Sequence, residues 1–277
     1  MTPAELVHRT PAARWRPKPL VAASMAVHAA ALIAFIAQLE LWAWSLGALA
    51  ANHAVLTVFG MLPRNALLGA NLCNLPPESA RRGEIALTFD DGPDPEVTPK
   101  VLDLLEAHGV RASFFCIAEN AQRHPELCRE IVRRGHAVEN HSARHPHTFA
   151  LRGMGGMRRE IAAAQSALAE LCGRAPRFFR PPAGIRSPLL DPILHETGLA
   201  LVSWTRRGYD TQRQDADGVT ARLARDLAAG DILVLHDGHA ARTRGGVPVV
   251  LEVLPRVLDA AAGRRLRAVT LRQAIEP

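Results

Sequence analysis

Two pairs of side chains in this 277-residue chain have the types and spacing of a hydrolytic metal site. His141 and His145, in the segment NHSARHP, are four residues apart, and on one turn of the chain this spacing places two imidazoles on the same face. Asp90 and Asp91 are adjacent, and neighbouring carboxylates repel each other unless a cation compensates them. Two histidines and one carboxylate form a three-ligand set that leaves positions open for water and substrate, as in hydrolytic zinc sites.

Three further polar residues favour hydrolysis over the alternatives. Two histidines and a carboxylate also bind the iron of non-haem oxygenases, and the Asp-Gly-Pro sequence that begins at residue 91 is by itself ordinary turn chemistry. However, Asp90 is a spare carboxylate suited to a general base, and His236 suits a general acid near neutral pH. Arg180 could orient the base. A base, an acid and a metal-activated water are the components of metal-dependent hydrolysis.

The elements that must position these residues follow an alternating pattern from residue 84 onward. The expected strands are 84–89, 111–117, 137–139, 178–179, 199–203, 232–235 and 267–269. The expected helices are 98–107, 125–134, 157–171, 188–197, 219–228 and 247–262. Such alternation predicts an α/β fold with parallel strands, and the number of units suits a barrel better than an open sheet.

The polar candidates gather after the predicted strands. They are Asp90, Asp91, His141, His145, Arg180, Asp210 and His236. In a parallel α/β barrel the active site forms at the carboxyl ends of the strands. The sequence therefore predicts that these side chains meet at one end of the barrel.

Four motifs in order resemble those of the NodB-homology polysaccharide deacetylases, carbohydrate esterase family 4. They are TFDDGPD at 88–94, NHSARHP at 140–146, FRPPAG at 179–184 and LVLHDG at 233–238. The resemblance extends over about residues 83–274, which is nearly all of the chain beyond its apolar start. It implies a distorted, seven-stranded (β/α) barrel. It also implies a divalent metal ion, zinc first, with cobalt, manganese or nickel as alternatives.

The same resemblance implies a role for each candidate residue. The implied metal ligands are Asp91, His141 and His145, the implied base is Asp90, and the implied acid is His236.

Three further roles follow from the same resemblance, with Asp210 at the place where the family's fourth motif supplies an aspartate. By resemblance, Arg180 orients the base, Asp210 tunes the acid, and the backbone N–H of Ala183 helps to hold an oxyanion. Three positions depart from the family pattern: Ala183 replaces a tyrosine, Thr211 a tryptophan and Val234 a leucine. These departures remove or shrink groups that line the substrate pocket, while the metal, base and acid residues are intact.

The expected reaction is hydrolysis of an N-acyl amide, most simply N-acetyl, on an amino sugar of a glycan or a lipid-linked saccharide. Two alternatives remain: an O-acyl carbohydrate esterase, and a catalytically weak glycan-binding module at the membrane. Arg206 and Arg207 could hold a substrate phosphate, although a solvated loop is the simpler interpretation. His239, Arg242 and Arg244 could form a rim for an anionic substrate.

The start of the chain has the pattern of a membrane segment. Residues 20–37 carry no formal charge, and residues 41–62 form a second apolar stretch after Glu40. The basic residues Arg9, Arg14, Arg16 and Lys18 precede them, which predicts a cytoplasmic N-terminus at a bacterial inner membrane. A two-helix hairpin would keep the catalytic domain in the cytoplasm, whereas one span would place it in the periplasm.

The chain is thus expected to divide into four segments. These are a basic N-terminus at 1–18, a membrane segment at 19–62, a linker at 63–83 and the NodB-like domain at 84–277. The formal net charge of +6 does not indicate nucleic-acid binding, because 31 of the 33 basic residues are arginine and no block of five like charges occurs. No nucleic-acid-binding motif accompanies the arginines.

Overall fold

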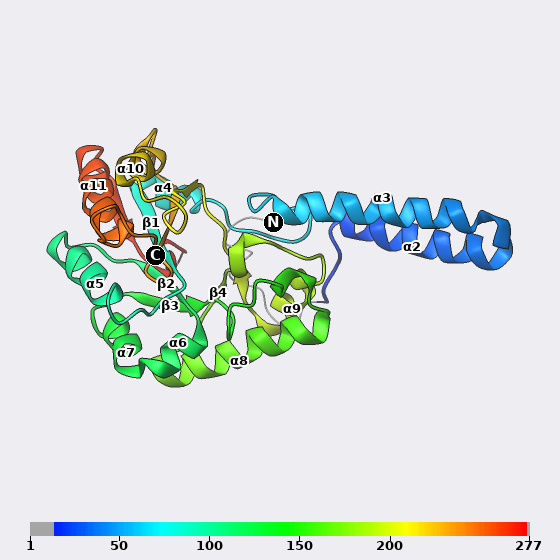
Figure 1. Ribbon diagram of the computed structural model, residues 1–277, viewed down its shortest axis with the longest axis horizontal. Helices are drawn as coiled ribbons and strands as arrows, with labels where there is room; N and C mark the ends of the chain where they lie inside the picture. The colour runs from blue at the N-terminus through cyan, green and yellow to red at the C-terminus, as the bar shows by residue number, and fades with distance from the viewer. Residues whose placement is uncertain (1–13, 276–277) are drawn as a thin grey trace.

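The computed structural model describes residues 14–275, so residues 1–13 of the predicted basic N-terminus lie outside the described part of the chain. Figure 1 shows an α/β domain from which a pair of antiparallel helices projects. The domain carries the predicted site, and the helix pair corresponds to the predicted membrane segment.

All strand pairs of the domain are parallel and belong to one curled sheet. Its strands are β1 (Glu84–Asp90), β2 (Ser113–Cys116), β3 (Ala137–Asn140), β4 (Phe178–Phe179), β5 (Ala200–Leu201), β6 (Arg206–Arg207), β7 (Ile232–His236) and β8 (Arg267–Val269). Seven of them form the path β5-β4-β3-β2-β1-β7-β6, and β8 pairs with β1 off this path. The predicted class, a distorted seven-stranded barrel of parallel strands, is confirmed.

The sheet curls because its two edge strands belong to one extended segment, residues 200–207. The segment pairs with β4 through Leu201 and, a few residues later, with β7 through Arg206 and Arg207. A segment that pairs on one side at its start and on the other side at its end draws the two edges of a sheet together. The sequence did not indicate β6, because two arginines carry no strand signal.

Alternation along the strands decides which side chains face the inside of the curled sheet. In β1, Ile85, Leu87 and Phe89 belong to the main hydrophobic cluster with the covering helices. The alternate residues Ala86, Thr88 and Asp90 therefore face the opposite side, because successive side chains of a strand point to opposite faces. Strand β7 has the same pattern, with Leu233 and Leu235 in the main cluster and His236 on the inner side. This inner side is the one that carries the chemistry.

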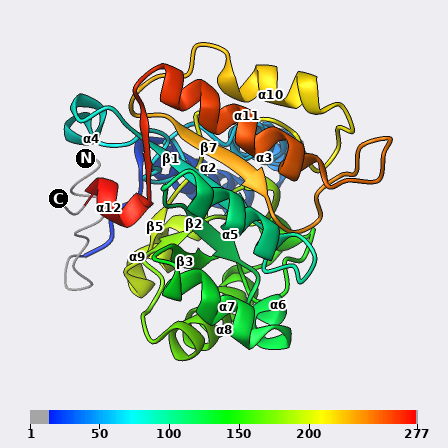
Figure 2. The same ribbon diagram turned by 90° about the vertical axis from the view of Figure 1, so that its left-hand side faces the viewer.

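Helices cover the outer face of the sheet (Figure 2). They are α5 (Thr98–Ala107), α6 (Ala118–Arg123), α7 (Pro125–Arg133), α8 (Met154–Cys172), α9 (Leu190–Thr197), α10 (Ala216–Ala224) and α11 (Val249–Gly263). Short helical segments are α4 (Pro77–Arg81), α12 (Leu271–Ile275), η2 (Phe149–Leu151) and η3 (Pro182–Gly184).

The helix prediction for 219–228 was displaced at both ends. Asp215 caps the start of α10 by accepting a hydrogen bond from the backbone N–H of Asp217, so the helix begins at Ala216. It ends at Ala224, and Asp226 has a positive φ of 50°, a conformation that does not continue an α-helix. The helices α4, α6 and α12 were not predicted, because elements this short carry little periodic signal.

The helix pair consists of α2 (Pro19–Ala37) and α3 (Trp42–Met61), joined by the 3-10 turn η1 (Leu39–Leu41). The segments Pro19–Ala37 and Leu39–Met61 have mean hydropathies of 2.2 and 1.2, and by length and composition both could cross a membrane. Only 17% and 11% of the two segments are buried, whereas a core helix of a soluble domain is mostly buried. At 1.5 Å per residue each helix is about 30 Å long, similar to the apolar thickness of a bilayer.

Polar residues within the helix pair are paired with each other. Asn52 donates a hydrogen bond to the Ser24 hydroxyl (2.9 Å), and the His28 and His53 rings meet edge to face with Nε2 atoms 3.4 Å apart. Asn52 and His53 lie near the middle of the second apolar stretch, where unpaired polar side chains are unfavourable in lipid. Their pairing across the hairpin removes much of that cost.

The base of the hairpin rests on the domain. The backbone N–H of Arg186 donates to the carbonyl oxygen of Gly60 in α3 (3.0 Å), and the Trp15 indole donates to Asp191 (2.9 Å). The connection after α3 is packed rather than free, because Leu72 forms a parallel bridge with Val202 at the edge of the sheet. The hairpin is therefore tied to the same end segment, residues 200–207, that closes the sheet.

Candidate active site

Asp90, the last residue of β1, is held by a fully buried arginine. Arg180 follows β4 and donates from one NH group to Asp90 Oδ1 (2.6 Å) and to the Thr88 hydroxyl (2.8 Å). Its guanidinium also donates to the carbonyl oxygens of Val202 and Ser203 and lies over the Phe115 ring at 4.1 Å. Burial lowers the pKa of Arg180, and the Asp90 carboxylate opposes that shift. Every side of the guanidinium has a partner, so Asp90 has one fixed orientation.

Asp91, His141 and His145 converge on one point. Asp91 Oδ1 lies 3.2 Å from His141 Nε2 and 3.3 Å from His145 Nε2. Ligands about 2.0–2.1 Å from a tetrahedral zinc ion lie about 3.3 Å from one another, so these spacings match one shared ion. Asp91 Oδ1 is also buried without a hydrogen-bond partner, which is costly unless a cation meets it. The described residues therefore fit a divalent metal.

Neighbouring groups prepare these three residues as ligands. The Nδ1 atom of His141 faces the Arg180 carbonyl oxygen at 2.7 Å, which directs Nε2 toward Asp91. Burial, and next His141, lower the pKa of His145 to about 4, so its imidazole is neutral, the form that binds metal. Asp91 and His145 both have positive φ angles, 73° and 52°, and such strained backbone is typical of functional sites.

His236, the last residue of β7, is paired with Asp210. Its Nδ1 atom faces Asp210 Oδ1 (2.8 Å), and its backbone N–H donates to Asp210 Oδ2 (2.8 Å). Burial lowers the pKa of His236, but the Asp210 carboxylate outweighs it and raises that pKa to about 9. His236 is in register with Asp90 on the neighbouring strand. A protonated imidazole and a carboxylate thus stand side by side.

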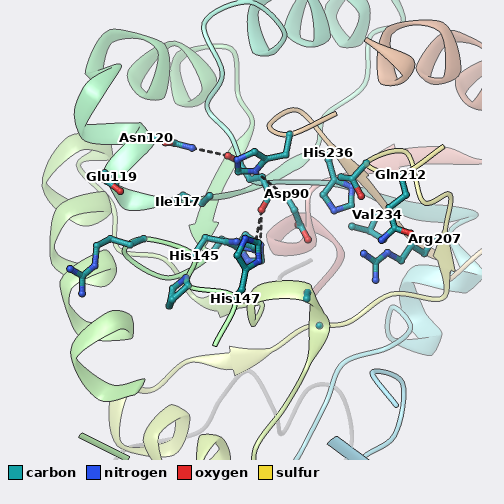
Figure 3. A pocket seen from close by; sticks show the side chains of 18 of the residues that line it. Asp90, Ile117, Glu119, Asn120, His145, His147, Arg207, Gln212, Val234 and His236 are labelled. Carbon is teal, nitrogen blue, oxygen red and sulfur yellow. Dashed lines mark hydrogen bonds and ion pairs between the residues drawn. The ribbon is translucent and has the colours of Figure 1, made fainter. Parts of the chain in front are cut away.

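These groups surround one cavity of about 780 Å³. Figure 3 shows Asp90 between His145 and His147 on one side and His236, Val234 and Arg207 on the other. Asp91, His141 and Ala183 also line it, whereas Arg180 and Asp210 lie behind and act through Asp90 and His236. The structure thus brings all eight predicted site residues together.

Ala183 lies in the short turn η3 with a φ of 56°. The next residue, Gly184, has a φ of 73°, and a Cβ there would lie 2.3 Å from the Trp204 ring. Only glycine fits that position. Ala183, Thr211 and Val234, the three departures from the family pattern, all line this cavity. The side chains at these three places in its wall are therefore smaller than those that the family pattern implies.

Several residues at or near the cavity make contacts that the sequence did not predict. His239 Nδ1 lies 3.3 Å from the second oxygen of Asp91, and Asn120 donates to the Asp91 carbonyl oxygen (2.9 Å). His239 follows LVLHDG by one residue, which was its only signal, and it was expected to be a substrate rim residue. Arg242, expected in the same rim, pairs with Glu96. Trp204 offered no signal, since only the curl of residues 200–207 brings it to the site.

Comparison with known proteins agrees with the fold and with the family that the motifs resemble. The family model described as Polysaccharide deacetylase matches residues 78–202. A peptidoglycan-N-acetylglucosamine deacetylase of Bacillus cereus is 34% identical over 64% of this chain and 64% of its own length. The match thus spans less than two thirds of that relative. A chitooligosaccharide deacetylase of Sinorhizobium fredii is 38% identical over 56% of this chain and 72% of its own length.

Solved structures give the same result. The structure of the Bc1960 peptidoglycan N-acetylglucosamine deacetylase is 31% identical, with a TM-score of 0.66, and the match covers 74% of this chain and 92% of that one. The motifs, the parallel curled sheet and these matches agree, and they confirm the resemblance seen in the sequence. This chain belongs to the polysaccharide deacetylase family, carbohydrate esterase family 4.

Proposed function

We propose that this protein is a metal-dependent hydrolase that removes an N-acyl group, most simply N-acetyl, from an amino sugar of a glycan or a lipid-linked saccharide. The observation that carries the proposal is the set of complementary groups around one cavity: three metal-ligand side chains, the carboxylate Asp90 and the acid His236. The named activities of its relatives support the same reaction class.

The metal would be held by Asp91, His141 and His145. When bound, a divalent ion such as zinc polarises the acyl carbonyl group and makes water more acidic; cobalt, manganese or nickel would serve similarly. Asp90 accepts the proton of the attacking water, and Arg180 keeps its carboxylate pointed at that position. The backbone N–H of Ala183 would donate to the oxyanion that forms on the acyl carbon.

His236 completes the reaction by protonating the leaving nitrogen. An amine is a poor leaving group until it is protonated, whereas the alcohol of an ester leaves more readily. Asp210 raises the pKa of His236 to about 9, so the imidazole carries its proton at neutral pH. This arrangement favours an amide over an ester and so an N-deacetylase over the O-acyl esterase. The complete set of base, acid and ligands also opposes a binding module without activity.

We further propose that the hairpin α2–α3 is inserted in the bacterial inner membrane with the domain on the cytoplasmic side. Its two helices could each cross the apolar layer, and both of their domain-side ends lie at the same face. Arg14, Arg16 and Lys18 precede the first helix and Arg64 follows the second, as the positive-inside rule expects.

The test of the proposed activity is acetate release by the full-length protein in detergent. Protein stripped with a chelator should be inactive on chitooligosaccharides and on lipid-linked N-acetylglucosamine, and added zinc should restore acetate release. Asp90→Asn should reduce kcat by about 10²–10⁴-fold without loss of bound metal. Asp259→Asn, an exposed carboxylate, is the matched control. No acetate from either substrate with full metal occupancy would refute the proposal.

A further inference from the structure

A second cavity, beside the catalytic one, is lined by arginines. It has a volume of about 1,020 Å³ and contains Arg64, Arg206, Arg207, Arg213, Arg222 and Arg225. We call it the arginine groove. Asp226 is the only acidic residue among its lining residues. A cavity with this balance of charge attracts an anion.

Most of these arginines are not neutralised. Arg206 pairs with Asp231, but no carboxylate partner is found within the described residues for Arg207, Arg213, Arg222 or Arg225. Arginines that face one cavity without counter-charges repel one another, and a bound anion relieves that repulsion. Guanidinium groups pair well with phosphate, because their N–H groups match two of its oxygens.

Arg207 marks where the anion would bind relative to the catalytic cavity. Its guanidinium lies over the rings of Trp204 (5.1 Å) and Tyr209 (5.0 Å), and its buried Nε atom has no hydrogen-bond partner. Aromatic rings beside it restrict the side chain while leaving its N–H edge available. Arg207, Trp204 and Ala183 line both cavities, so an anion in the groove is next to whatever occupies the catalytic cavity.

The opposite end of the groove begins where the hairpin ends. Met61 and Leu62, at the end of α3, line it and are 62% and 49% exposed. Arg64 follows two residues later and donates to the Thr205 carbonyl oxygen (3.0 Å), which joins the hairpin exit to the segment that carries Arg207. With the hairpin in a membrane, the groove lies at the depth of lipid phosphates, and the apolar helices continue from it.

An apolar groove of about 1,030 Å³ adjoins the arginine groove at Met61. It lies between the hairpin base and the loops of the domain, and exposed Leu151, Ile185 and Leu189 are among its lining residues. The three cavities thus follow one another in a fixed chemical order: polar catalytic, cationic, apolar. That order matches a sugar, a phosphate and a hydrocarbon chain.

We propose that the arginine groove binds the phosphate or diphosphate that links the N-acylated sugar to a membrane lipid. This inference rests on the proposed N-deacetylase function and narrows its substrate to a lipid-phosphate-linked amino sugar. The sugar occupies the catalytic cavity, the phosphate contacts Arg207, Arg213 and Arg222, and the lipid chain follows the apolar surface beside Met61.

The direct test is binding of farnesyl phosphate to the full-length protein in uncharged detergent, measured by titration calorimetry. Farnesyl phosphate should bind at least about tenfold more tightly than farnesol or inorganic phosphate, because each lacks one of the two contacts. Arg213→Gln/Arg222→Gln should weaken binding at least about tenfold. The matched control, Arg159→Gln/Arg264→Gln, removes the same charge outside all three cavities and should leave the affinity unchanged.

Three outcomes would overturn the inference. The first is that both double variants bind farnesyl phosphate with the same affinity. The second is that uridine diphosphate N-acetylglucosamine binds as tightly as farnesyl phosphate. The third is that short-chain phosphatidylglycerol displaces farnesyl phosphate at concentrations equal to those of unlabelled farnesyl phosphate. The second outcome would indicate a soluble nucleotide sugar, and the third a general contact with lipid headgroups.

A kinetic comparison separates this inference from the proposed function. Wild-type protein should deacetylate farnesyl-phosphate-linked N-acetylglucosamine with a higher kcat/KM than N-acetylated chitotriose. Arg213→Gln/Arg222→Gln should reduce the ratio of those two kcat/KM values by about tenfold or more. Activity on both substrates with an unchanged ratio refutes the phosphate site alone. Absence of activity on both refutes the proposed function, while the calorimetric result still tests the groove.

Discussion

At the scale of single residues, the site works through pairs in which one side chain fixes another. Arg180 fixes Asp90, Asp210 fixes His236, and the Arg180 carbonyl oxygen fixes His141. All of these groups are buried or nearly so, and low dielectric makes each pairing strong and each unpaired partner costly. The site residues therefore affect both stability and reactivity.

Replacing Asp210 by Asn should shift the pH dependence of activity. The Asp210 carboxylate raises the pKa of His236, so its loss lowers that pKa and the acid loses its proton at a lower pH. The alkaline limb of kcat/KM should move from about pH 9 toward neutrality, with about a tenfold loss of activity above neutral pH. Steady-state rates across neutral and alkaline pH measure the shift. An alkaline limb that stays in place would show that His236 is not the acid.

Removing the buried charge of Arg180 should destabilise the fold. Arg180→Met leaves the Asp90 carboxylate buried without its partner, and such a change typically costs about 3–5 kcal/mol. The double variant Asp90→Asn/Arg180→Met removes both charges and should recover part of that loss. Thermal unfolding in detergent measures both. Equal unfolding temperatures for the single and the double variant would contradict a dominant charge pairing.

At the scale of elements, the extended segment 200–207 connects the parts of the molecule. It closes the sheet through β5 and β6, supplies two carbonyl oxygens to Arg180, and carries Trp204 and Arg207. It also contacts the chain that leaves the hairpin, through Leu72 and Arg64. The segment 200–207 thus connects the hairpin, the edge of the sheet and the Arg180–Asp90 pair.

Two glycines of α3 offer a matched test of the hairpin's docking. A Cβ on Gly60 would lie 2.5 Å from the backbone oxygen of Arg186, whereas a Cβ on Gly47 would have no atom within 4 Å. Gly60→Val should therefore force the hairpin away from the domain and cost about 1–3 kcal/mol of stability. Gly47→Val carries the same change in helix propensity without the clash. Thermal stability and protease cleavage within residues 63–76 report the difference, and identical behaviour would contradict this docking.

At the scale of the whole molecule, the cavities form a continuous series from the base of the hairpin to the catalytic cavity. The arginine groove shares Met61 with the groove at the base of the hairpin and shares Ala183, Trp204 and Arg207 with the catalytic cavity, so the three are contiguous. An enzyme built this way would reach a substrate held at the membrane surface without withdrawing it from the bilayer. A hairpin inserted in the membrane as proposed would then contribute to specificity as well as to location.

The hairpin predicts that both ends of the protein lie on the same side of the membrane. A fluorescent protein fused after residue 277 should fluoresce in the cytoplasm, and alkaline phosphatase at the same position should be inactive. Alkaline phosphatase fused after Gln38, at the turn of the hairpin, should be active, because that turn lies on the opposite side. Phosphatase activity at both positions would instead indicate a single span and a periplasmic domain.

From the sequence alone, the candidate site residues and most of the elements that carry them could be predicted. Motif resemblance and strand pattern together predicted the eight residues that the structure gathers around the cavity, because most of them follow strands whose apolar pattern is clear, and parallel strands end on the same side. The alternation within β1 and β7 also places Asp90 and His236 on one face.

Which distant segments meet depends on the packing of the whole molecule. The sequence predicts neither the contact of His239 with Asp91, nor the position of Trp204 against Gly184, nor the gathering of Arg64 with Arg207 and Arg222. Each depends on the curl of the sheet and on the position of the hairpin. Both are determined by many contacts between residues that are far apart in the chain. Local sequence patterns indicate whether a segment forms a strand or a helix and which of its faces is buried. The contacts named above depend instead on how separate elements pack against one another.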